Sequence, residues 1–351
     1  MSKTRMGIIG HFARSVIKLD GQTVKTSMLY SELSRHFVDD SIMIADTYQW
    51  KKRGFKLLFE TICIMVKCNY VIIILKDKGL RVFLPLLFMM NLFLHRSIHH
   101  VVLGGDLPEI IRANTGMLYF LKTLAGNYVE TASMRQKLNA MGLDNVFVMP
   151  NFKRLPILDE RELNMNYEKP FALCTFSRVS QAKGIEDAII AVSIVNESLG
   201  DTVFTLDIYG QVDPEFEERF QNLLAMSPST IQYKGIVPFN HSVPVLQRYF
   251  LLLFPTHYVG EGFPGTLIDA FSAGLPVLAS DWRYNSELVE DNIDGFIVKA
   301  NDVQAISSKL IEIAKAPDEI VKMKKNCLET AWRFHTDHVI EDFLSNMGVC
   351  K

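Results

Sequence analysis

Short apolar runs alternate along this chain with longer segments in which apolar residues recur every three or four positions. In the first half, the apolar runs predict strands at residues 5–12, 41–45, 70–75, 98–103, 127–130 and 146–149. Helical spacing appears between them at 24–37 and at 133–141. Residues 20–23 are expected to form a turn, with Thr23 as the N-cap of the first helix. Strand followed by helix, repeated, predicts a doubly wound parallel sheet.

The same alternation starts again at residue 171, after a polar and irregular stretch at 152–169. The predicted strands are 171–176, 204–209, 231–234, 251–255 and 277–279, and the predicted helices are 185–199, 214–226, 243–249, 265–273 and 285–290. Helical spacing continues from 302 to 347. We therefore expect an α/β protein of two Rossmann-like domains, residues 1–151 and 152–330. A C-terminal helix at 331–351 is expected to pack back on the first domain.

The most hydrophobic stretch lies at residues 79–94. Only 13 residues separate Arg81 from His95, and Pro85 and Asn91 are among them, so this stretch is too short to span a bilayer. A core helix is the favoured interpretation, and an interfacial helix that dips into a bilayer is the alternative. A basic amphipathic segment starts at 51–56 and runs to about residue 67.

Composition supports two globular domains with different partners. The chain has 351 residues, of which 48% are hydrophobic and 22% charged. Residues 1–150 hold 19 Lys or Arg against 11 Asp or Glu, a balance of +8, whereas the remainder holds 18 against 28, a balance of −10. A basic, apolar-rich first half suits peripheral contact with an anionic membrane. Nucleic acid is the rival partner, but no binding motif or basic run interleaved with aromatics occurs, so none is predicted.

Cysteine usage and the N-terminus bear on the compartment. The five cysteines show neither CxxC nor paired metal spacing: Cys63, Cys68, Cys174, Cys327 and Cys350. They are interpreted as buried thiols in a reducing compartment. The first six residues lack the apolar core of a signal peptide. We therefore expect a cytoplasmic protein, peripheral on the inner face of the cell membrane.

Candidate chemistry centres on residues 257–276, which are predicted to form a loop, a helix and a stop. Gly260 and Gly262 flank Glu261, so the backbone there can turn sharply and approach a ligand. Pro264 suits a first helical position, and Gly274 with Pro276 ends the helix.

The start of that helix is a candidate anion site. The amides of Gly265, Thr266 and Leu267 are expected to be free at the helix N-terminus, where they attract anions. Glu261 before the helix and Asp269 within it bracket this end. Since carboxylates are poor partners for phosphate, they are assigned to the hydroxyls of a ligand that also carries phosphate, as a sugar nucleotide does. The alternative is an exposed surface helix with a capping Glu.

A second anion site is predicted where residues 176–184 link a strand to a helix. In doubly wound sheets, ligands bind outside the carboxyl ends of strands. There Arg178 can hold a diphosphate through its fork and Lys183 as a point charge. The alternative is a pair of solvated surface charges.

These segments resemble family 4 of the retaining glycosyltransferases with the GT-B fold, in which two Rossmann-like domains face a central cleft. The resemblance covers essentially the whole chain and is strongest at 171–300; the most similar members are bacterial capsule or exopolysaccharide transferases. The matching segments are Ser177-Arg178 with Lys183-Gly184, Glu261-Gly262-Phe263-Pro264, Ala273-Gly274-Leu275-Pro276-Val277, Asp294-Gly295-Phe296-Ile297-Val298, Gly21-Gln22-Thr23-Val24-Lys25-Thr26 and Met149-Pro150-Asn151.

The resemblance implies a role for each matching position. Arg178 and Lys183 would hold the donor diphosphate and stabilise the leaving group, and Glu261 would bond the hydroxyls of the donor sugar. The other implied donor contacts are Gly21, Gly262, Phe263, Pro264, Gly265, Thr266, Leu267, Asp269, Ile236 and Val237. Within this set the amides at 265–267 would contact the donor phosphate, the nucleotide base would pack near 235–237, and Asp269 would bind the ribose hydroxyls.

The chain departs from the family pattern in three places. Asp269 replaces the second Glu of the family motif and is one methylene shorter. Asp20 stands where many members have a glycine, and Gly104-Gly105 where some have a His. His99 and His100 lie earlier and are interpreted as structural.

The resemblance implies a retaining transfer from a nucleotide sugar, a UDP-sugar in preference to a GDP-sugar, to a saccharide or lipid-linked saccharide acceptor. No nucleophile–base pair is evident, and a same-face transfer assisted by the donor phosphate needs none. No Asp-x-Asp occurs and the basic pair can replace a metal, so neither metal nor cofactor is predicted. The rival interpretations are a GT-B sugar-nucleotide 2-epimerase and an inactive, donor-binding partner subunit. A dehydrogenase is excluded because no GxGxxG follows the first strand.

Overall fold

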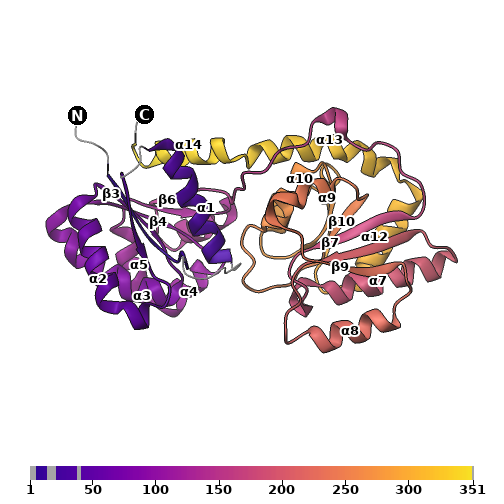
Figure 1. Ribbon diagram of the computed structural model, residues 1–351, viewed down its shortest axis with the longest axis horizontal. Coiled ribbons are helices and arrows are strands. Elements are labelled where there is room, and N and C mark those ends of the chain that lie inside the picture. The colour runs from indigo at the N-terminus through magenta and orange to yellow at the C-terminus, as the bar shows by residue number, and fades with distance from the viewer. Residues whose placement is uncertain (1–4, 14–20, 38–40, 350–351) are drawn as a thin grey trace. The chain divides into compact units, whose positions relative to one another are not determined.

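The computed structural model describes residues 5–13, 21–37 and 41–349. The chain divides into two compact units, Met1–Pro150 with Thr336–Lys351, and Asn151–His335 (Figure 1). Each unit contains one six-stranded parallel sheet with flanking helices, so the expected α/β class with two Rossmann-like domains is confirmed.

The sheet of the first unit has the strand order β2-β1-β3-β4-β5-β6. Its strands are β1 Met6–Gly10, β2 Ile42–Asp46, β3 Tyr70–Ile74, β4 Ser97–Val101, β5 Gly126–Val129 and β6 Val146–Val148. Its helices are α1 Gly21–His36, α2 Trp50–Lys67, α3 Asp77–Leu94, α4 Leu107–Ala113, α5 Thr115–Lys122, α6 Ala132–Ala140 and α14 Thr336–Asn346. Central strands β1 and β3 pair in register from Met6 opposite Tyr70, and almost every residue in them is buried, as helices on both faces require.

The sheet of the second unit has the strand order β12-β11-β10-β7-β8-β9. Its strands are β7 Phe171–Phe176, β8 Phe204–Tyr209, β9 Ile231–Gly235, β10 Leu251–Phe254, β11 Val277–Asp281 and β12 Gly295–Lys299. Its helices are α7 Ile185–Leu199, α8 Glu217–Met226, α9 Ser242–Leu246, α10 Gly265–Ser272, α11 Asn285–Leu288, α12 Val303–Lys315 and α13 Asp318–Arg333, with short 3₁₀ turns η1 Glu160–Glu162, η2 Gln181–Lys183 and η3 Phe239–His241. One apolar core lies against α7 and α12, and a second lies against α10 and α13.

Several sequence-based boundaries are wrong. The described residues Gly21–His36 are all helical and form α1, so the turn predicted at 20–23 and the N-cap role of Thr23 are wrong for residues 21–23; Asp20 lies outside the described residues. The structure also contains elements that the sequence pattern does not predict: helices α4 and α5 within residues 104–125, and the last strand β12.

The C-terminal stretch is two helices instead of one continuous arm. Phe334 adopts a non-helical backbone between α13 and α14, and the boundary between the two units falls just beyond it, at His335 and Thr336. Helix α14 contacts α1 and places Phe343 edge-on to Tyr128 within the first unit, with ring centroids 4.7 Å apart.

Among the described cysteines, Cys68, Cys174 and Cys327 are buried thiols, Cys63 is half-buried and none forms a disulfide; Cys350 lies outside the described residues. Burial raises the pKa of the Cys68 thiol to about 11. None of the helices in the described ranges is both long and apolar enough to cross a membrane.

Candidate active site

The strand order of the second sheet places its switch point between β7 and β10. From β7 the chain adds β8 and β9 on one side, then returns to add β10, β11 and β12 on the other. Loops that leave neighbouring strands at a switch point part in opposite directions and open a crevice at the carboxyl edge. The loop at 177–184 follows β7 and the loop at 255–264 follows β10, so both predicted anion-binding segments border this crevice.

The two loops are held closely together. The amide of His257 donates to the carbonyl of Ala182 at 2.8 Å. Gly184 has φ +70°, and a Cβ there would stand 2.2 Å from the carbonyl oxygen of Pro255. Only glycine tolerates both the left-handed backbone and this close approach, which explains the Lys-Gly dipeptide at 183–184.

Lys183 and Glu261 form an ion pair across the crevice, with Lys183 Nζ 2.5 Å from Glu261 Oε2. The same carboxylate oxygen accepts a hydrogen bond of 2.9 Å from the hydroxyl of Thr256, and Glu261 is only 7% exposed. The ammonium of Lys183 also lies 5.2 Å from the ring centroid of Tyr258. The structure therefore brings together the predicted phosphate cation and the predicted sugar acid, and each neutralises the other.

Arg178 lies after β7 on the same loop and is exposed. No ion pair with another described residue engages its guanidinium. It is thus available for an anion at the mouth of the crevice.

Helix α10 starts at this edge at Gly265, as predicted, but Pro264 precedes the first helical position instead of occupying it. Pro264 is its N-cap, and the hydroxyl of Thr266 donates to the carbonyl of Phe176 at 2.7 Å, which ties the helix start to the end of β7. The amide of Leu267 donates to the carbonyl of Pro264 at 3.1 Å, so the expectation of three free amides is wrong for Leu267. The amides of Gly265 and Thr266 have no acceptor in the described part of the chain.

Asp269 is buried, and both oxygens of its carboxylate are engaged. One oxygen accepts a hydrogen bond of 2.9 Å from Ser242, and the other pairs with the ammonium of Lys153. Lys153 also borders the start of α10, because a Cβ on Gly265 would lie 3.1 Å from its Nζ. Sequence reasoning missed both Lys153 and Ser242, and no local motif marks either.

The remaining predicted donor residues lie in several places. Gly262 and Phe263 complete the β10 loop, where the ring of Phe263 is buried against Phe334. Ile236 and Val237 follow β9 at the same edge of the sheet, and Ile236 is exposed. Gly21 is the exposed first residue of α1 in the other unit.

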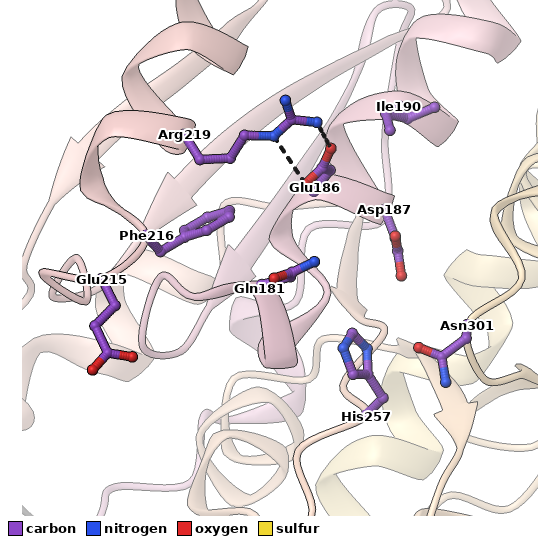
Figure 2. A pocket seen from close by; sticks show the side chains of 9 residues that line it. All are labelled: Gln181, Glu186, Asp187, Ile190, Glu215, Phe216, Arg219, His257 and Asn301. Atoms are coloured by element: carbon purple, nitrogen blue, oxygen red, sulfur yellow. Dashed lines mark hydrogen bonds and ion pairs between the residues drawn. The ribbon is translucent and has the colours of Figure 1, made fainter.

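A pocket of about 490 Å³ is lined by residues of the β7 loop, α7, α8 and the β10 loop, and none of the predicted site residues lines it. Figure 2 shows the ion pair of Arg219 with Glu186 on one side and Asp187, His257 and Asn301 on the other. Burial raises the pKa of Asp187, and the Nδ1 atom of His257 has no hydrogen-bond partner among the described residues. No group of three or more His, Cys, Asp or Glu side chains in the described ranges could hold a metal ion.

Comparison with known proteins relates the second unit to a family of glycosyl transferases. The family model for glycosyl transferases group 1 matches residues 158–330, which span the crevice and both loops. Residues 158–330 are therefore similar to the group 1 glycosyl transferases. Among curated relatives, the amylovoran biosynthesis glycosyltransferase AmsK of Erwinia amylovora is 24% identical over 194 residues, 53% of this chain and 47% of its own. The GtfA subunit of a UDP-N-acetylglucosamine–peptide N-acetylglucosaminyltransferase of Streptococcus agalactiae is 28% identical over 182 residues, 50% of this chain and 35% of its own.

Similarity at the level of the fold extends over nearly the whole chain and bears out the expected GT-B fold. The solved structure of Anabaena Alr3699/HepE in complex with UDP is similar with a TM-score of 0.77 at 13% identity, covering 99% of this chain and 100% of that one. The chain spans about half or less of the length of these two curated relatives, 47% and 35%.

Proposed function

We propose that this chain transfers a sugar from a nucleotide sugar to a saccharide acceptor in the synthesis of a cell-surface polysaccharide. A UDP-sugar is the favoured donor and a GDP-sugar the alternative. The proposal rests on the convergence of Lys183, Glu261 and the open first turn of α10 at the switch point of the second sheet. Cations and backbone amides suit a diphosphate, and a carboxylate suits sugar hydroxyls. The family match and a relative named for amylovoran biosynthesis support it.

Arg178 and Lys183 have complementary roles in this proposal. The exposed guanidinium of Arg178 takes one phosphate through its fork, and Lys183 takes the other as a point charge. Glu261 is freed to accept hydrogen bonds from donor-sugar hydroxyls as Lys183 turns to phosphate, while Thr256 keeps the carboxylate in place. The amides of Gly265 and Thr266 add the partial positive charge of a helix N-terminus.

The chemical step follows from where charge develops. The bond between the anomeric carbon and the phosphate oxygen breaks with oxocarbenium character, and negative charge grows on the leaving diphosphate. Arg178, Lys183 and the α10 amides stabilise that charge, which is the function a metal would otherwise serve. A phosphate oxygen takes the proton of the acceptor hydroxyl on the same face, so the anomeric configuration is retained and no protein base is needed.

The acceptor in this proposal is lipid-linked. An enzyme with such an acceptor meets its substrate at the inner face of the cell membrane. The basic balance of the first half of the chain fits an anionic surface there.

The test is nucleotide release from candidate UDP- and GDP-sugars in the presence and absence of acceptor saccharides. Arg178→Ala and Glu261→Ala are each expected to lower the rate by about 10²- to 10³-fold, as loss of one electrostatic contact to a transition state does. Arg161→Ala removes an exposed arginine of the same unit outside the site and serves as the control. Retention requires the product to keep the donor's anomeric configuration by NMR, and activity must survive EDTA. Unchanged release in both site variants would reject the assignments.

Two competing functions give different results in the same assay. A 2-epimerase would convert the donor with no acceptor present. A donor-binding partner subunit, a possibility raised by the relatives named as GtfA subunits, would bind nucleotide but turn over only with a second protein.

A further inference from the structure

Helix α2 has exposed apolar residues on the side opposite to the one that packs against the first sheet. Leu57, Thr61 and Ile64 are buried, whereas Phe55 is 95% exposed and Phe59 67% exposed. Ile62 and Val66 continue the exposed series at helical spacing, so 55, 59, 62 and 66 form one stripe opposite the buried one. A helix that only covered a sheet would present polar residues on that side.

Helix α3 repeats the arrangement. Its buried side consists of Leu80, Phe83, Leu84 and Leu87. On the opposite side Val82, Met89 and Phe93 are exposed and share one stripe by spacing, with Phe93 81% exposed. Helix α3 is the stretch for which the sequence leaves a core helix and an interfacial helix as alternatives. It has one buried apolar side and one exposed apolar side.

The two stripes lie on neighbouring helices. Helices α2 and α3 contact each other and follow one another on the same side of the first sheet (Figure 1). We use the name α2–α3 face for the exposed apolar residues of both helices and for four exposed lysines. The apolar residues are Phe55, Phe59, Ile62, Val66, Val82, Met89 and Phe93, and the lysines are Lys51, Lys52, Lys67 and Lys78. Seven exposed apolar side chains on two neighbouring helices indicate an interaction surface.

The charge of the two helices indicates the kind of partner. Together they hold seven Lys or Arg and only two acids, Glu60 and Asp77. Each acid is already close to a cation of its own helix. Four exposed lysines have no ion pair within the described ranges: Lys51, Lys52, Lys67 and Lys78.

We propose that the α2–α3 face binds the surface of an anionic lipid bilayer. Its phenyl rings and aliphatic side chains enter the boundary between headgroups and acyl chains, while its lysines meet lipid phosphates. This arrangement fits a bilayer better than a second copy of the chain, because a two-fold contact would set the same cationic patch against itself. It also fits a bilayer better than a protein partner, because protein interfaces are depleted in lysine.

The experiment measures flotation of the full chain with vesicles of phosphatidylcholine alone or with 30% phosphatidylglycerol by design. Binding is expected only with the anionic lipid, and it should weaken as salt rises. Lys51→Gln, Lys52→Gln and Lys67→Gln combined should lower the partition coefficient by on the order of 100-fold, at about fivefold per charge. Phe55→Ser, Phe59→Ser and Phe93→Ser combined should lower it by at least about tenfold.

Matched controls come from the second unit. Lys169→Gln, Lys315→Gln and Lys322→Gln remove the same charge from exposed sites. Ile194→Ser, Leu199→Ser and Met226→Ser remove exposed apolar side chains. Because all the substituted side chains are exposed, folding should persist, and thermal melting of each variant checks this.

The fluorescence of Trp50 gives an independent measure of how deeply the start of α2 enters the bilayer. This residue is exposed at the start of α2, and in Trp282→Phe with Trp332→Phe it is the one remaining tryptophan. Brominated anionic lipids should quench its fluorescence. Equal binding to both vesicle types, no loss in the two α2–α3 face variants, or a dimer dispersed by the phenylalanine substitutions would each overturn the proposal. Neither donor nor acceptor is present, so the result is independent of transferase activity.

Discussion

Lys153 and Asp269 form an ion pair that leaves the acid no free oxygen. Lys153 binds Oδ2 of Asp269, while Ser242 donates to Oδ1 at 2.9 Å, and Asp269 is 2% exposed. The resemblance assigns the ribose to this acid, which is one methylene shorter than its family counterpart. In this chain the pair also fixes an ammonium beside the first turn of α10.

Lys153 is therefore expected to help bind the donor phosphate. Lys153→Met should weaken UDP about tenfold, the usual effect of losing one charge-assisted hydrogen bond, and leave uridine affinity unchanged. Calorimetric titration of both ligands gives the ratio. Equal weakening of UDP and uridine would instead indicate a structural ion pair.

Asp269→Asn distinguishes between two roles for Asp269, which are positioning Lys153 and binding the ribose. If the acid only positions Lys153, UDP and uridine should both bind nearly as before. If it grips the ribose, both should weaken together. The double variant removes both charges and controls for a buried charge left without its partner.

Gly184→Ala is expected to destabilise the second unit and abolish donor binding. The new Cβ would have to adopt φ +70° and would stand 2.2 Å from the carbonyl of Pro255, so the β7 and β10 loops must separate. We expect a loss of about 2 kcal/mol or more in the free energy of unfolding. Gly200→Ala is the matched control, with φ +64° and nothing within 4 Å, and should cost only about 1 kcal/mol. Urea unfolding of both variants checks this, and equal losses would show that the loop contact is unimportant.

The elements that the sequence predicts well are those with strong periodicity and clear stops. Helix α10 was placed within a residue because Pro264 and Gly274 restrict its two ends, and Gly274 has the expected positive φ of +60°. The break at Phe334 was missed because the apolar spacing continues through it into α14. Helices α4 and α5 were missed because each is short and Asn114 interrupts the pattern between them.

Within the candidate site, residue types were easier to predict than partners. Lys183 and Glu261 were each identified from a local motif, but their pairing spans 78 residues and depends on the strand order. Lys153 is 116 residues from Asp269 and belongs to no motif, so only the folded chain reveals it. Local patterns specify which groups face an edge of the sheet, and topology decides which of them meet.

Lys324 should make stability rise as the solution becomes alkaline. Its ammonium is buried, donates to the carbonyl of Gly274 at 3.1 Å, and burial lowers its pKa to about 8 from 10.5. Between these values the unfolded chain binds a proton that the folded chain does not, so stability increases from pH 8 to 10.5, by about 3 kcal/mol at most. Lys324→Met should lack this rise, so the stability of the parent relative to the variant should increase with pH, measured by urea unfolding at pH 7, 8.5 and 10. A constant difference across this range would contradict the assignment.

His100 should make the first unit sensitive to acid. It is fully buried in β4, its Nδ1 lies 3.2 Å from the side-chain oxygen of Asn127, and its Nε2 has no partner in the described part of the chain. Burial lowers its pKa to about 4 from 6.5, so the unfolded chain takes up a proton first as the pH falls. The stability that this residue contributes is complete above pH 6.5 and is lost between pH 6.5 and 4, by about 3 kcal/mol at most. His100→Gln should unfold at higher urea relative to the parent at pH 4.5 than at pH 7. His338→Gln, at an exposed position, should show no such change between the two pH values, and parallel losses in all three proteins would mean that His100 is not responsible.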